Sequence, residues 1–133
     1  MLIESVDFFR LDANRKLDPE KRSDLGQFMT PPSTARLMAS MFEANKKHIT
    51  LLDAGAGVGS LTAAFVSEIC ARKKRPDSIS VVAYEIDTAL ADYLADTLEQ
   101  CRKAAEAANI KFRHRPLTGN KSLLPAYGRE TTS

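Results

Sequence analysis

A short segment near the middle of the chain combines a carboxylate with three glycines at alternate positions. It reads Asp53-Ala54-Gly55-Ala56-Gly57-Val58-Gly59. Glycine lets a backbone turn sharply and lie close to a ligand, and a helix that starts beyond such a loop carries N–H groups without intrahelical partners. The segment therefore predicts a binding loop for a small molecule. The alternative without a ligand is a tight turn between a strand and a helix.

The spacing of the glycines argues against two phosphate-binding loops. The dinucleotide fingerprint G-x-G-x-x-G needs a sixth-position glycine, where this chain has Ser60, and its third glycine, Gly59, comes one residue early. No Gly-Lys-Ser/Thr follows, as a phosphate loop requires. A nicotinamide oxidoreductase is therefore the weakest candidate function.

A second carboxylate, Glu85, follows the next apolar run, some thirty residues after Asp53. A carboxylate at the end of a strand can accept hydrogen bonds from both hydroxyls of a ribose, in nicotinamide folds and methyl-donor folds alike. The alternative is that Glu85 and Asp87 stabilise the start of a helix near Thr88. Of these two acids, Asp87 is the expected cap.

Strands and helices must alternate to bring these residues together. Three apolar runs predict strands, and the helical spacing of apolar residues predicts helices between them. The expected strands are 48–53, 79–84 and 109–113, and the expected helices are one or two short ones within 1–25, then 33–45, 60–71 and about 20 residues from 88. We expect an α/β fold whose parallel strands are buried on both faces, with helices on both faces of the sheet. Helix 33–45 is expected to cover the core with one apolar stripe: Leu37, Met38, Met41 and Phe42.

Composition limits the class of protein. With 133 residues, 44% of them hydrophobic, the chain has the size of one small globular domain. Its two cysteines, Cys70 and Cys101, make no disulfide framework or zinc-ligand pattern and are expected to be buried thiols. No apolar stretch is long enough to cross a bilayer and no signal peptide is evident, so a cytoplasmic protein is expected. The net charge of +2 is too small to indicate a partner.

The D-x-G-x-G-x-G loop resembles motif I of the S-adenosylmethionine-dependent methyltransferases. An upstream segment, Gly26-Gln27-Phe28-Met29-Thr30-Pro31-Pro32, resembles motif X of the adenine amino-group DNA methyltransferases of restriction-modification systems. The order of motifs X, I and II is similar to that of the gamma class of these enzymes, and the resemblance covers residues 1–113. It implies a partial Rossmann-like methyltransferase fold that binds S-adenosylmethionine. The residues it assigns to the cofactor are Phe28, Thr30, Asp53, Ala54, Gly55, Gly57, Gly59, Glu85 and Ile86.

The catalytic part of that family has no counterpart in these 133 residues. The tetrapeptide [NDS]-P-P-[YFW], which holds the flipped adenine, is absent, and an acid expected at the end of the third strand is replaced by Arg113-His114-Arg115. No catalytic and no metal-binding residue is therefore assigned. We expect a helical segment with motif X at 1–32, a partial core at 33–113 and an irregular tail at 114–133, for which a non-native origin is one interpretation.

These absences lead to a hypothesis about the whole protein. The chain is expected to be the N-terminal cofactor half of a longer DNA methyltransferase, which contacts DNA through parts that are missing here. Two alternatives stay open: a non-catalytic remnant or accessory subunit completed by a second chain with the catalytic motif, and a methyltransferase that acts on RNA, protein or a small molecule. Cations at 72–75 and 111–115 could meet DNA phosphates, but a solvated loop at a helix end is the favoured explanation.

Overall fold

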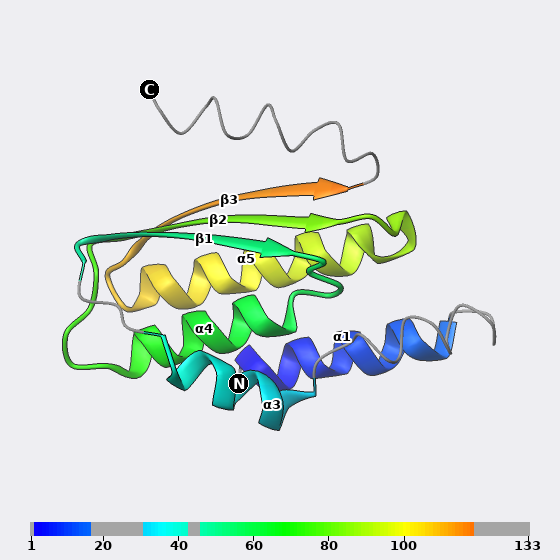
Figure 1. Ribbon diagram of the computed structural model, residues 1–133, viewed down its shortest axis with the longest axis horizontal. Coiled ribbons are helices and arrows are strands. Elements are labelled where there is room, and N and C mark those ends of the chain that lie inside the picture. The colour runs from blue at the N-terminus through cyan, green and yellow to red at the C-terminus, as the bar shows by residue number, and fades with distance from the viewer. Residues whose placement is uncertain (1, 17–30, 43–45, 119–133) are drawn as a thin grey trace.

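The computed structural model describes residues 2–16, 31–42 and 46–118. Four helices, one 3-10 turn and three strands make up these parts of the chain (Figure 1). In chain order they are α1 (Leu2–Lys16), α3 (Pro32–Ser40), β1 (His48–Ala54), α4 (Ser60–Ala71), β2 (Ser78–Glu85), η1 (Thr88–Leu90), α5 (Ala91–Ala107) and β3 (Lys111–Thr118). Strands and helices alternate from β1 onward, as the sequence predicts.

The three strands form one parallel sheet in the order β1-β2-β3. The α/β fold expected from the sequence is therefore confirmed, and it is consistent with part of a Rossmann-like methyltransferase. The expectation of helices on both faces is not met, because all four described helices lie on one face of the sheet (Figure 1). Right-handed crossovers through α4 and α5 lead to neighbouring strands in the same direction each time, and such crossovers leave both helices on the same side.

The core lies between this layer of helices and the sheet. Its largest fully buried side chains include several from α4, β2 and α5: Phe65, Ile69, Ile79, Leu94 and Leu98. Of the one or two helices predicted within 1–25, the described residues contain α1, which packs on α4 and α5, and the rest of that segment lies outside them. The Tyr93 hydroxyl of α5 donates to the Asp12 carboxylate of α1 at 2.8 Å, which ties these two helices together.

Burial of β1 differs from the sequence prediction. The strand was expected to be buried on both faces, but exposed residues alternate with partly or fully buried ones, and Leu52 is 52% exposed. Ile49 and Leu51 pack against the helices, and Leu52 points to the other face of the sheet. No described helix covers that face. A strand covered on one face needs apolar side chains only on that face, so β1 has more apolar residues than the described helices can cover.

The orientation of α3 also corrects a prediction. The stripe that was expected to cover the core is largely exposed: Leu37 60%, Met38 42%, Met41 71% and Phe42 39%. Within it, the Phe42 ring still packs edge-on against the core residue Phe65, with 5.1 Å between ring centroids. The helix instead buries Ala35 and Ala39, which pack against Ala64 of α4. Alanines let two helix backbones lie close together, and here that close approach decides which side of α3 is buried.

Strand β3 runs to Thr118, five residues beyond the predicted end at Arg113. Phe112 and His114 face α5, and alternate residues point away from it, so the period-2 pattern continues past the expected boundary. Pro116 has no backbone N–H to donate to a neighbouring strand. Among the described residues β3 is an edge strand, and an edge strand tolerates a missing donor on its outer side. The start of the region predicted to be irregular, 114–118, is therefore strand.

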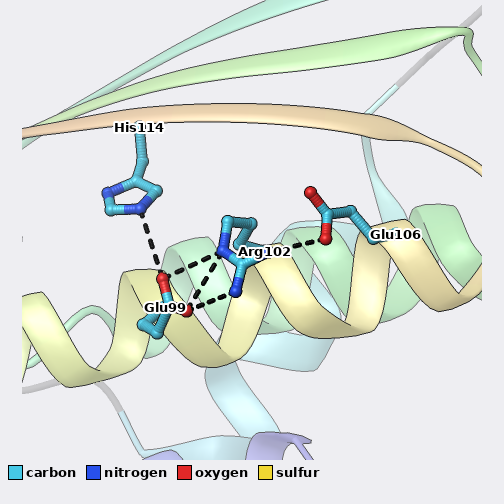
Figure 2. Close-up of polar contacts among 4 residues, drawn as sticks. All are labelled: Glu99, Arg102, Glu106 and His114. Carbon is cyan, nitrogen blue, oxygen red and sulfur yellow. Dashed lines mark hydrogen bonds and ion pairs between the residues drawn. The ribbon is translucent and has the colours of Figure 1, made fainter.

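Polar groups of α5 lie beneath β3 (Figure 2). The Arg102 guanidinium donates to the carboxylates of Glu99 and Glu106, and His114 Nε2 lies 3.8 Å from Glu99 Oε2. Arg102 holds the pKa of Glu99 below its usual range. His114 is thus directed to the surface of α5 and away from the glycine loop.

Both cysteines are free thiols, and the expected burial is confirmed for Cys101, where it raises the pKa to about 12. Cys70 is only partly buried, so the prediction is wrong for this residue. In the described ranges no cluster of three metal-ligating side chains occurs. No described helix is both long and apolar enough to cross a bilayer.

Candidate functional site

The glycine loop connects the end of β1 to the start of α4, at the carboxyl edge of the parallel sheet (Figure 1). All three glycines adopt positive φ angles: 75° at Gly55, 59° at Gly57 and 90° at Gly59. Residues with a Cβ rarely adopt this conformation, so the glycines are required by the backbone itself. Ligands of open α/β sheets bind at this edge.

The amides of the first half of the loop point toward β2. Those of Gly55 and Ala56 both donate to the Tyr84 carbonyl, at 2.7 and 2.9 Å. The next amide, of Gly57, donates to the Glu85 carboxylate at 2.7 Å. Three successive donors are therefore used within the fold. A loop that cradles a diphosphate directs its amides at the ligand instead.

Glu85 is the residue that joins the two predicted halves of the site. Its side chain is 5% exposed and accepts hydrogen bonds from the amides of Gly57 and Asp87. Asp87 has the capping role that the sequence suggests, since its carboxylate accepts from the Ala89 amide at 2.9 Å. The structure therefore assigns different tasks to these two neighbouring acids.

Asp53 lies at the base of the loop with 8% of its surface exposed. The Thr62 hydroxyl, in the first turn of α4, donates to its carboxylate at 2.7 Å. Burial raises the pKa of Asp53, bonds from Thr62 oppose that shift, and the charge of Glu85 adds to it. Because the N-cap residue of α4 is Gly59, which has no side chain, Asp53 supplies a carboxylate to this helix start.

Apolar surface borders the two carboxylates. Ile86, directly after Glu85, is 59% exposed, and Ala54 at the end of β1 is exposed as well. An exposed branched side chain beside a strand end offers a flat apolar face to a ring. The structure thus brings together seven of the nine residues that the sequence assigns to the cofactor, by their position at one edge of the sheet.

The other two assigned residues, Phe28 and Thr30, lie outside the described residues. What the structure describes of motif X is its end. Pro31 is extended, with φ −65° and ψ 157°, and α3 begins at Pro32. An extended segment that enters a helix here is what the two prolines predict.

The end of the third strand, where an acid was expected, lies further along the chain than the sequence predicts. Arg113, His114 and Arg115 lie within β3, whereas the register pairs Glu85 with Thr118. The strand end that borders the site is therefore at Thr118, and the three basic residues do not stand there. The absence of an acid at 113–115 thus says nothing about the site.

Exposed cations gather at the opposite edge of the sheet. Lys47, Asp77 and Lys111 are linked there by backbone hydrogen bonds between the strand starts, and Lys73 and Lys74 lie on the turn before β2. This edge is separated from the loop by the length of the strands, roughly 20 Å. Among the described residues, the charged side chains at the glycine loop are therefore the carboxylates of Asp53 and Glu85.

Two threonines support the loop, and the sequence analysis assigned neither. Thr62 bonds to Asp53, and the Thr97 hydroxyl of α5 donates to the Val58 carbonyl. Both side chains are fully buried. Thr62 lies three residues past a glycine N-cap, in the first helical turn, where a side chain that takes part in capping is expected. Nothing in the sequence around Thr97 sets it apart from the other residues of its helix.

Comparison with known proteins gives two curated relatives of this chain. It is 41% identical to the type II methyltransferase M.PstI of Providencia stuartii over 110 residues, which are 83% of this chain and 21% of the relative. It is 40% identical to the type II methyltransferase M.BsuBI of Bacillus subtilis over 98 residues, which are 73% of this chain and 19% of that relative. The chain thus spans about a fifth of the length of these relatives. No family model and no solved structure matches it.

Proposed function

We propose that this chain is the S-adenosylmethionine-binding portion of a site-specific DNA methyltransferase of a restriction-modification system, whose target is the exocyclic amine of adenine. Its similarity to two type II methyltransferases supports the reaction class. The adenine target rests on the resemblance of residues 26–32 to motif X. DNA is accordingly the proposed macromolecular substrate.

The choice of ligand rests on one observation: successive backbone amides of the loop donate to groups of β2, and carboxylates lie beside the loop. The amides of Gly55, Ala56 and Gly57 are engaged, and Asp53 and Glu85 bring negative charge. A diphosphate would meet like charge and few donors here. A ligand with ribose hydroxyls and a cationic methionine end suits the same surroundings.

The residues fit the donor in distinct ways. Glu85 would accept the ribose hydroxyls, the loop from Gly55 to Gly59 would let the backbone lie against the ligand, and Ile86 would offer an apolar face to the adenine ring. Asp53 would contribute negative charge beneath a cationic ligand while it holds the start of α4. Phe28 and Thr30 would complete the pocket at the methionine end. When bound, S-adenosylmethionine supplies a methyl group on a positively charged sulfur.

Methyl transfer itself needs groups that these 133 residues do not provide. No [NDS]-P-P-[YFW] tetrapeptide occurs in the sequence to stack the flipped adenine and hold its amine. We therefore assign no catalytic residue and no metal to the chain. The base-binding and DNA-contacting parts would come from a longer protein or from a complementing chain.

There are two alternatives, and the first is a non-enzymatic fragment. As an inert remnant, the folded chain would not bind the donor, whereas an accessory subunit would form a complex with a chain that carries the tetrapeptide. A methyltransferase acting on RNA, protein or a small molecule is disfavoured by the match at residues 26–32. Purification of the chain together with a neighbouring gene product distinguishes the subunit from the remnant.

The ligand assignment is tested by calorimetric titration of the purified chain, after circular dichroism has established that it is folded. S-adenosylmethionine, its neutral product S-adenosylhomocysteine, and NADH are titrated in parallel. We expect both sulfur ligands to bind and NADH to show no heat of binding. Binding of NADH in preference to both, or no binding of any ligand by the folded chain, contradicts the proposal.

A further inference from the structure

Helix α5 reaches the glycine loop through one polar side chain, Thr97. Its hydroxyl donates to the carbonyl of Val58, and both residues are almost completely buried. A buried carbonyl without a partner costs free energy, so this bond satisfies a group that the turn into α4 leaves unpaired. The contact joins residues 39 positions apart in the sequence.

The same side chain also limits the space at Gly59. A Cβ at Gly59 would lie 2.7 Å from the Thr97 methyl carbon and 3.3 Å from Leu94 Cδ1. The loop backbone is therefore pressed directly against α5 at the residue where φ reaches 90°. Thr97 contacts two successive loop residues, with its hydroxyl on one and its methyl on the other.

The two halves of the loop are thus held by different elements. Strand β2 binds the first half through the Tyr84 carbonyl and the Glu85 carboxylate. Thr97 holds the second half, where the chain turns into α4. Within the loop the Gly59 amide donates to the Ala56 carbonyl at 2.8 Å, and this bond joins the halves.

We propose that Thr97 is a positioning residue for the methyl-donor site: it fixes Val58 and Gly59, and thereby the loop against which the donor binds. This inference rests on the function proposed above and adds a residue that contacts the loop and not the ligand. Loss of its hydroxyl leaves the Val58 carbonyl buried and unpaired and lets the second half of the loop move.

Two substitutions separate the hydroxyl from the packing. Thr97→Val keeps the side-chain volume and removes the donor, whereas Thr97→Ser keeps the donor and removes the methyl. Cys101→Ala is the matched control, because Cys101 is fully buried one turn further along α5 and is not part of the loop contacts. All three variants truncate or alter one buried side chain of the same helix.

The variants are compared by calorimetric affinity for S-adenosylmethionine and by hydrogen exchange of the Gly59 amide in the chain without ligand. We expect Thr97→Val to weaken the affinity roughly tenfold and to speed exchange at Gly59. Thr97→Ser is expected to stay within about threefold in affinity, and Cys101→Ala to change neither measurement beyond its effect on global unfolding.

Equal affinity and equal exchange in Thr97→Val and the unsubstituted chain would overturn the inference. So would equal losses in Thr97→Val and Cys101→Ala, because they would point to general destabilisation. Failure of the unsubstituted folded chain to bind the donor would refute the proposed function and the ligand half of this inference, while Gly59 exchange would still decide whether Thr97 holds the loop.

Discussion

The Glu85 carboxylate accepts the backbone amide of Gly57 at 2.7 Å, although the two residues belong to different strand-to-helix connections. It also accepts the Asp87 amide at 2.9 Å. A carboxylate has about four lone-pair sites, so both bonds leave capacity for ligand hydroxyls. Glu85 can therefore hold the glycine loop and contact a bound ribose at the same time.

Substitutions at Glu85 should separate these two tasks. Glu85→Gln keeps an acceptor for the Gly57 amide but turns an NH2 donor toward the Asp87 amide and loses the charge, so we expect stability to fall by about 1–3 kcal/mol and donor affinity to fall at least tenfold. Glu85→Ala should lower both. Thermal unfolding and calorimetry measure the two effects. Asp87→Asn, which keeps the cap on Ala89, serves as the control and should retain affinity.

If Glu85→Gln bound the donor as tightly as the unsubstituted chain, the carboxylate would have only its structural role in the loop. The assignment of ribose recognition to Glu85 would then be wrong.

Gly59 and Gly55 should differ in their tolerance of alanine. Both have positive φ, so either substitution strains the backbone by about 1–2 kcal/mol. At Gly55 the added Cβ meets nothing within 4 Å, whereas at Gly59 it would lie 2.7 Å from Thr97 Cγ2. We expect Gly59→Ala to destabilise the chain by at least about 1 kcal/mol more than Gly55→Ala. Urea unfolding of the two variants measures the difference, and equal losses would show that the contact with α5 yields easily.

Asp53 should make stability depend on pH. Burial raises its pKa in the folded chain above the unfolded value, so the unfolded state loses its proton first as pH rises. The contribution of Asp53 to folding is thus highest below the unfolded pKa and decreases as pH rises through the folded pKa. Asp53→Asn, which keeps an acceptor for Thr62, removes this decrease.

The free energy of unfolding of Asp53→Asn, minus that of the unsubstituted chain, should therefore increase from about pH 3 to pH 7. Denaturant titrations over this range measure the slope. A difference that is constant with pH would show that Asp53 ionises in the folded chain as easily as in the unfolded one.

The parts of the site that the sequence predicts correctly are those marked by patterns of neighbouring residues. Glycines at alternate positions after an apolar run, and an acid after the next run, are patterns of neighbouring residues, and the structure brings both to one sheet edge. The bond from Thr62 to Asp53 is local, and its place past a glycine N-cap is a signal that sequence could have used. The support from Thr97 depends on how α5 packs against the loop, and a threonine within a helix carries no mark of a distant contact, so Thr97 could not be assigned.

The errors in the fold have physical causes as well. The predicted boundary at Arg113 rested on a loss of hydrophobic pattern, but β3 continues because Phe112 and His114 still face α5. Helices on both faces were inferred from alternation alone, and alternation does not fix the strand order. The sheet order β1-β2-β3 is what leaves every described helix on one face.

Helix α3 allows a test in which sequence pattern and structure predict opposite results. The apolar stripe suggests that Leu37 is in the core, yet it is 60% exposed, whereas Ala39 is 1% exposed and packs near Ala64. Ala39→Leu would force extra methyl groups between two closely packed helices, and we expect a loss of about 1–3 kcal/mol. Leu37→Ala should change stability by less than about 1 kcal/mol, because it removes side-chain atoms that are largely in water. Chemical unfolding of both variants checks the order; a larger loss for Leu37→Ala would mean that the stripe, and not the alanine face, is the buried side of α3.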